Sequence, residues 1–193
     1  KSGRLTPEQW RHLESATKPL GAAPLFIDDT PALSVFEFRS KARRLKIHND
    51  IKIIIIDYLQ LMQSAKRTES RVQEISDITR NLKIMAKELN VPVIALSQLS
   101  RAAEKTTGRS DHRPQLSDLR DSGSIEQDAD IVLFLYRAAY YNAQNGEENQ
   151  ANENEAECIV AKNRHGETGK VELRWMPEYT AFGTLETRYD EDE

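Results

Sequence analysis

The most apolar stretch of the chain runs from Ile51 to Met62, where four consecutive isoleucines precede a single carboxylate, Asp57. An apolar run without alternating polar positions is typical of a strand buried on both faces, in the middle of a parallel sheet covered by helices. Ligands of open α/β sheets bind at the carboxyl ends of such strands. Asp57 is therefore either a Mg²⁺-binding carboxylate or the cap of the next turn, and this short motif alone does not decide between them.

Helical and strand-like patterns alternate along the rest of the chain. Residues 70–89 carry apolar side chains at helical spacing, and residues 91–98 and 130–137 are near-continuous apolar runs. Residues 156–162 and 169–176 flank a polar turn and predict a closing hairpin. Strands that alternate with helices before a hairpin predict an α/β fold, with a mostly parallel sheet flanked by helices and an antiparallel C-terminal edge.

Smaller elements are predicted at both ends of the chain. Thr6 and Ser34 each begin a capping box and should each start a helix. Residues 24–29 form a short apolar run that predicts a buried strand ending in carboxylates. The Asn-, Gln- and Glu-rich residues 140–155 suggest a disordered surface excursion, and residues 189–193 an acidic, frayed tail.

Composition narrows the class of protein. The 193 residues are 38% hydrophobic and 30% charged with a net charge of -4, so contact with nucleic acid would have to come from a local loop or groove. The single cysteine, Cys158, forms no disulfide within the chain, and the histidines show no zinc-ligand spacing. Because there is no apolar run long enough for a membrane span and no signal peptide, we expect a cytoplasmic protein. We also expect residues 1–188 to belong to one domain.

A second polar side chain ends the apolar run at residues 91–98. Gln98 should lie at the same sheet edge as Asp57, and its amide can donate to a γ-phosphate while accepting from the backbone or water. It is a candidate nucleotide sensor; the alternative is an amide that caps its own strand. The polar, glycine-containing residues 99–128 follow, and a loop of this length inside a compact domain is usually functional or mobile.

Four ordered segments together carry a family resemblance: residues 54–59, 95–101, 113–130 and 162–166. They closely resemble the DnaB family of bacterial replicative DNA helicases, and the resemblance covers essentially the whole chain. It implies a RecA-like motor domain in a hexameric ring that uses ATP and Mg²⁺ to move 5′ to 3′ on single-stranded DNA and unwind duplexes. It also implies a primase and a helicase loader as partners, in the bacterial cytoplasm and without a membrane.

The resemblance implies roles for individual residues. Asp57 matches the Walker B aspartate that holds Mg²⁺, and Gln98 matches the γ-phosphate sensor. Arg120, Asp121 and Gly123 match a loop in the central channel that contacts the DNA backbone; the family usually has glutamate where Asp121 stands. An arginine and glycine amides can hold a phosphate without reading bases. The alternative for Arg120 is a surface ion pair with a neighbouring aspartate.

Three further basic residues match family positions. Lys162 and Arg164 match cations that enter the neighbouring subunit's ATP site, where a trans-acting arginine stabilises charge on the transferring phosphoryl group. The alternative is a pair of solvated hairpin charges. Arg137 matches a position that packs against the nucleotide base in related ring helicases, and a plain surface arginine is its alternative.

The phosphate-binding loop motif G-x-x-x-x-G-K-[ST] does not occur in these 193 residues. The nearest imitation, residues 166–171, has the wrong spacing and no hydroxyl after its lysine. We therefore expect an incomplete domain, the C-terminal part of the motor, which is inactive as an ATPase in isolation. Two other functions remain open: a RecA-type recombinase ATPase, which shares the strand, the aspartate and the glutamine, and a non-enzymatic fragment that binds DNA or a partner.

Overall fold

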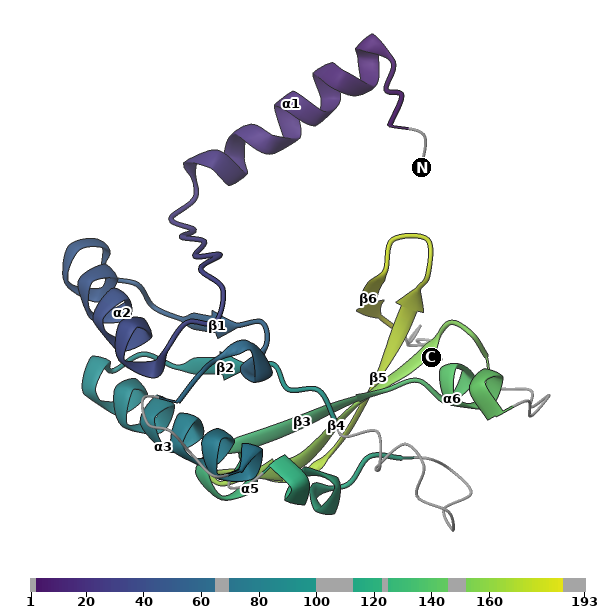
Figure 1. Cartoon of the computed structure of the whole chain (residues 1–193). Helices are drawn as coiled ribbons and strands as arrows, with labels where there is room; N and C mark the ends of the chain where they lie inside the picture. Colours follow the sequence, from purple (N-terminus) through teal and green to yellow (C-terminus); the bar gives the residue numbers. More distant parts are fainter. Residues whose placement is uncertain (1–2, 65–69, 100–112, 123–124, 146–151, 186–193) are drawn as a thin grey trace, which may run out of the picture.

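The computed structural model describes residues 3–64, 70–99, 113–122, 125–145 and 152–185 (Figure 1). In chain order the elements are α1 (Pro7–Ala22), α2 (Val35–Asn49), β1 (Ile54–Ile56), the 3-10 helix η1 (Leu59–Leu61), α3 (Arg71–Leu89), β2 (Val93–Ala95), the 3-10 helix η2 (Leu116–Ser122), α5 (Ile125–Asp128), β3 (Ile131–Tyr136), α6 (Ala138–Asn145), β4 (Glu155–Asn163), β5 (Gly169–Met176) and β6 (Ala181–Thr184). Within these ranges, every helix is too short or too polar to cross a membrane.

Strands β1 and β2 form a parallel pair, in which Ile54 lies opposite Val93 and Ile56 opposite Ala95. Backbone hydrogen bonds continue beyond the strands: Leu96 N–H donates to the Ile56 carbonyl at 2.9 Å, and Leu59 N–H donates to the Leu96 carbonyl at 2.8 Å. The segments that follow β1 and β2 therefore leave the sheet side by side at its carboxyl edge.

The main core lies between α2, α3 and one face of this parallel pair. Its centre is Ile78 on α3, whose side chain is fully buried, and Leu59 is 1% exposed. The helical spacing predicted for residues 70–89 is confirmed, with Ser70 as the N-cap of α3. The other buried members are Val35, Ala42, Ile56, Met62, Ile75, Leu82, Met85, Leu89 and Val91.

The opposite face of the parallel pair is open in the described part of the chain. Ile55 is 62% exposed and Ile94 is 47% exposed. The prediction that this apolar run is buried on both faces is therefore wrong for the described residues. The reason is that α2 and α3 cover one face of β1 and β2, and no described helix packs on the other.

Strands β3 to β6 form a four-stranded antiparallel sheet in the order β3-β4-β5-β6. Along β3 the side chains alternate, with Val132, Phe134 and Tyr136 buried, because this strand presents one face to the core and one to solvent. The predicted hairpin is confirmed as β4 and β5. Strand β3, which the sequence placed among the parallel strands, instead pairs antiparallel with β4.

Helix α1 projects away from the rest of the molecule (Figure 1) and buries none of its side chains. Its capping box forms as predicted: Gln9 N–H donates to Thr6 Oγ1 at 3.2 Å, and Thr6 N–H donates to Gln9 Oε1 at 2.9 Å. Residues 24–29 follow as an irregular, exposed segment, with Ile27 85% exposed. The predicted strand does not form there because, in the described chain, no strand pairs with it.

Residues 140–155 were predicted to form a disordered surface segment, but the first of them belong to helix α6. Its Tyr141 ring stacks on Tyr136 of β3 with a centroid separation of 5.5 Å, and Tyr140 meets Tyr141 edge to face at 5.4 Å. These aromatic contacts stabilise a helix that the polar composition concealed. Residues 146–151 and the predicted tail at 189–193 lie outside the described residues.

Candidate functional site

Asp57 lies immediately beyond the last residue of β1, at the carboxyl edge of the parallel pair. Its side chain is exposed, and its carboxylate makes no hydrogen bond or ion pair with any residue that the structure describes. A free carboxylate at this edge suits Mg²⁺, which binds one or two protein carboxylates and completes its octahedron with phosphate oxygens and waters. The described residues contain no cluster of three or more acidic, His or Cys side chains that could hold a metal by themselves.

Gln98 reaches the same edge, and Gln60 holds its backbone there. Gln60 Nε2 donates to Ser97 Oγ at 3.0 Å and to the Gln98 carbonyl at 3.0 Å, and Gln98 N–H donates to Gln60 Oε1 at 3.4 Å. Arg71 Nη2 donates to the Gln60 carbonyl at 2.6 Å, which anchors Gln60 to the start of α3. The side-chain amide of Gln98 has no partner within the described chain and is therefore available to a ligand.

Gln60 was missed by the sequence analysis. The available signal was an amide three residues after Asp57, in a segment that is otherwise apolar and aromatic up to Met62. A polar side chain at such a position needs a partner once the segment packs against its neighbour. Its partner, the residue 97–98 segment, became identifiable only when the parallel pairing of β1 with β2 was known.

The predicted DNA-contacting loop is described in part. The backbones of Arg120 and Asp121 belong to η2, whereas their side chains and the whole of Gly123 lie outside the described residues. The preceding Leu119 is 3% exposed and packs against Val132 and Phe134 of β3. This contact fixes η2, to which the backbones of Arg120 and Asp121 belong, to the antiparallel sheet.

Lys162 and Arg164 both bind the segment that joins the predicted DNA loop to β3. Lys162 Nζ donates to the Glu126 carbonyl at 2.6 Å and to the Ala129 carbonyl at 2.9 Å. Arg164 Nη1 lies 3.1 Å from Asp130 Oδ1, and Arg164 Nη2 donates to the Gln127 carbonyl at 3.3 Å. Both cations are thus engaged with residues 126–130 of their own chain, and their role in a neighbouring ATP site stays a prediction.

Asp130 is the acidic centre of this cluster. One carboxylate oxygen binds Lys83 of α3 and the other binds Arg164. The hydrogen bond from Lys83 lowers the pKa of Asp130 below its ordinary value; desolvation opposes the shift, and the charges of Lys83, Arg164 and His165 reinforce it. Asp130 therefore stays anionic at neutral pH and remains a partner for both cations.

Arg137 lies at the other end of β3, one strand length or roughly 20 Å from Asp130. Its guanidinium carbon lies 4.1 Å from the ring centroid of Trp175 and 5.8 Å from that of Tyr140, both within the range of cation–π contacts. Its Nε and the Nε1 of Trp175 are both buried, and neither has a hydrogen-bond partner in the described part of the chain. The structure thus places Arg137 on protein aromatic rings, at the opposite end of β3 from the residues that Lys162 and Arg164 bind.

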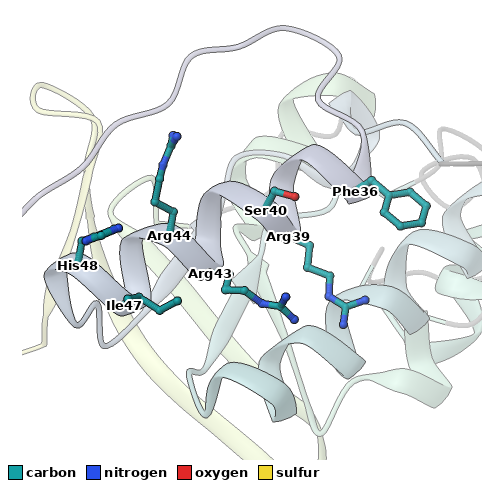
Figure 2. A pocket seen from close by; sticks show the side chains of 7 residues that line it. All are labelled: Phe36, Arg39, Ser40, Arg43, Arg44, Ile47 and His48. Atoms are coloured by element: carbon teal, nitrogen blue, oxygen red, sulfur yellow. The ribbon is translucent and has the colours of Figure 1, made fainter.

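A hollow on the outer face of α2 contains none of the predicted site residues (Figure 2). Arg39 and Arg43 extend from it towards α3, and both pair with Glu88 there. Arg44 points away from these two and has no partner among the described residues. The residues that line the hollow are Phe36, Arg39, Ser40, Arg43, Arg44, Ile47 and His48.

Comparison with known proteins agrees with this arrangement. The family model for the DnaB-like helicase C terminal domain matches residues 1–184. The replicative DNA helicase DnaB of Geobacillus stearothermophilus is 52% identical over 99% of this chain, and the replicative DNA helicase DnaC of Bacillus subtilis is 50% identical over 99%. The chain spans 40% of the length of each of these relatives.

Solved structures show the same fold. A DnaB-like replicative helicase, whose structure was solved to show its interactions with primase, superimposes with a TM-score of 0.82 at 44% identity, over 96% of this chain and 43% of that one. A solved ATPase domain superimposes with a TM-score of 0.81 at 44% identity, over 94% of this chain and 62% of that one. The predicted RecA-like α/β fold is confirmed, with its parallel pair, flanking helices and antiparallel C-terminal sheet. The chain therefore belongs to the family of DnaB-like helicase C-terminal domains.

Proposed function

We propose that the protein containing this chain is an ATP-dependent replicative DNA helicase, which works as a hexameric ring, moves 5′ to 3′ on single-stranded DNA and unwinds duplexes. The observation that carries the proposal is a pair of side chains at the carboxyl edge of β1 and β2, Asp57 and Gln98, that have no partner among the residues the structure describes. Relatives that are half identical to this chain are replicative DNA helicases. The proposed setting is the bacterial cytoplasm, with residues 1–188 as part of one motor domain.

At the nucleotide, Asp57 would hold Mg²⁺ and Gln98 would contact the γ-phosphate. Bound Mg²⁺ neutralises charge that develops on the β- and γ-phosphate oxygens. The Gln98 amide can donate to a phosphate oxygen while Gln60 holds the Gln98 backbone in place. Binding of the γ-phosphate would therefore act on the residue that precedes the following loop. The phosphate-binding loop itself would come from outside these 193 residues.

Lys162 and Arg164 would enter the ATP site of the neighbouring subunit, which makes hydrolysis depend on ring assembly. Arg120, Asp121 and Gly123 would contact the phosphates of single-stranded DNA, a mode of binding that does not read sequence. Arg137 would pack against the nucleotide base. A primase and a helicase loader are the proposed protein partners. One structural relative, a DnaB-like replicative helicase, is described together with its interactions with primase.

The test uses the full-length protein and its variants Asp57→Asn and Arg164→Ala. We expect closed six-membered rings, ATP hydrolysis stimulated by single-stranded DNA, and unwinding of forked duplexes that have a free 5′ tail. Both variants should form rings but lose hydrolysis. Open filaments on DNA, with strand exchange in place of unwinding, would show a recombinase instead.

The isolated chain provides a second test. It should not hydrolyse ATP, because it contains no phosphate-binding loop motif. ATPase activity of the isolated chain that disappears with Asp57→Asn would contradict this expectation. Salt-sensitive binding of single-stranded DNA that is lost with Arg120→Ala, together with an inactive full-length protein, would instead support a binding fragment without enzymatic function.

A further inference from the structure

The segment from Glu126 to Asp130, which lies between the predicted DNA loop and β3, is held by side chains from two other elements. From the end of β4 and the residue after it, Lys162 and Arg164 donate to its carbonyls and carboxylate. From α3, Thr79 Oγ1 donates to Asp128 Oδ2 at 2.6 Å, and Lys83 binds Asp130. The segment is thus fixed from both sides by polar contacts.

We propose that Asp130 is the positioning residue for Arg164 and thereby ties the trans-acting cations to the DNA loop of their own subunit. This inference rests on the proposed function, because it concerns the cation that acts in the neighbouring ATP site. It adds three residues, Asp130, Lys83 and Thr79, which act by holding Arg164 and the segment at residues 126–130 in place.

The geometry gives Asp130 two attachments to Arg164. Arg164 N–H donates to the Asp130 carbonyl at 2.9 Å, and its Nη1 lies 3.1 Å from Asp130 Oδ1. The second carboxylate oxygen is bound by Lys83, so the carboxylate cannot turn away without breaking that pair. Antiparallel pairing of Ile131 with Asn163 fixes the register, so the residues on either side, 130 and 164, are held next to each other.

Arg164 remains able to act outside its own subunit, since 45% of its side chain is exposed. A phosphate in the neighbouring site would compete with Asp130 and with the Gln127 carbonyl for its guanidinium. Similarly, a phosphate that draws Lys162 away removes the donor from the Glu126 and Ala129 carbonyls. Capture of the cations by nucleotide therefore loosens the segment beside the DNA loop, and ordering of that segment by DNA changes what the cations can reach, because coupling between two sites is reciprocal.

The first experiment replaces Asp130 with asparagine in the full-length protein. This change keeps the shape of the side chain but removes the charge that holds Arg164 and Lys83. We expect DNA-stimulated kcat to fall by about 10- to 100-fold, the scale on which misplacement of a catalytic group lowers the rate. The KM for ATP, ring formation and affinity for single-stranded DNA should change less than about threefold, and Asp130→Glu should recover part of the activity.

Asp28→Asn is the matched control, because Asp28 also pairs with a lysine, Lys41 Nζ at 2.6 Å, but lies outside this cluster. It should leave kcat unchanged. If Asp130→Asn retains the wild-type kcat and the wild-type stimulation by DNA, the inference is overturned. If Arg164→Ala itself retains full activity, the proposed trans role of Arg164 fails instead, so the two failures are distinguishable.

The second experiment tests whether the defect acts in trans. Subunits with Asp130→Asn have an intact Asp57 but a misplaced Arg164, whereas subunits with Asp57→Asn have the reverse. Rings assembled from a mixture of the two should show more ATPase activity than either variant shows alone, because some interfaces then combine an intact Asp57 with a correctly held Arg164. Absence of recovery would show that Asp130→Asn damages its own subunit's fold or site, and would refute the positioning role.

Discussion

Replacement of Gln60 by alanine tests most directly whether the carboxyl edge of the parallel pair is a nucleotide sensor. The Gln60 side chain makes two hydrogen bonds of 3.0 Å to Ser97 and Gln98 and a longer one of 3.4 Å from Gln98 N–H. A neutral hydrogen bond contributes about 0.5–1.5 kcal/mol net, so the two shorter bonds together contribute about 1–3 kcal/mol. Part of this site is open to solvent, so we take about 1.5 kcal/mol as the working value.

That energy fixes the predicted effect on catalysis. If the hydrogen bonds hold Gln98 in its working position, their loss lowers the ratio of working to displaced positions by about tenfold, since 1.4 kcal/mol corresponds to a factor of ten in an equilibrium constant. We expect kcat for ATP hydrolysis by the full-length ring to fall by about that factor, with KM for ATP and affinity for DNA little changed. Gln60→Glu should not restore the rate, because it lacks the amide that donates to Ser97 Oγ and the Gln98 carbonyl.

The assay is steady-state ATPase activity with saturating single-stranded DNA, together with a check that rings still form. Gln73→Ala is the matched control: Gln73 is exposed on α3, and its side chain has no partner among the described residues. A kcat within twofold of wild type for Gln60→Ala would refute the reasoning. So would a defect that appears only in DNA affinity, because Gln60 touches the predicted sensor and not the predicted DNA loop.

Three further predictions concern stability and the role of Arg137. Ile78→Ala should lower the free energy of unfolding by about 2–5 kcal/mol in chemical denaturation, because Ile78 is fully buried at the core centre; a loss below about 1 kcal/mol would contradict this. The hydrogen bond from Arg113 lowers the pKa of Glu157, so the folded carboxylate contributes stability that is present above the unfolded pKa of about 4.3 and is lost as pH falls through the lower folded value. The stability difference between wild type and Glu157→Gln should therefore be largest near about pH 6 and shrink towards about pH 3, and a pH-independent difference would argue against the pair. Arg137→Ala should lower the thermal stability of the sheet through lost contact with Trp175, and it should raise the KM for ATP because Arg137 is proposed to pack against the base; an unchanged KM would refute that packing.

Local patterns in the sequence were sufficient for several elements. The helix at residues 70–89, the hairpin of β4 and β5, and the capping boxes at Thr6 and Ser34 all depend on residues close together in the chain, and all are present. The shared sheet edge of Asp57 and Gln98 was predictable for a related reason: each follows an apolar run, and the carboxyl ends of neighbouring parallel strands meet at one edge.

Elements that depend on a neighbour were not predictable in the same way. Residues 24–29 have the composition of a strand but stay irregular, because a strand exists only when another strand pairs with it. For β3 the apolar run was recognised, but its antiparallel partner was not, since an apolar run carries no information about direction. Helix α6 was concealed by its polar composition and depends on a ring contact between Tyr136 and Tyr141.

The sequence by itself determined the chemistry available to this protein: a carboxylate and an amide after two apolar strands, a pair of basic residues at the end of a later strand, and the family to which their order belongs. Only the tertiary structure decided what holds these groups. Gln60 binds the backbone of Gln98, and Asp130 binds Arg164, across separations that no local pattern encodes. The physical reason is that hydrogen bonds and ion pairs have a reach of a few ångströms, so strand pairing and register must first bring the partners together.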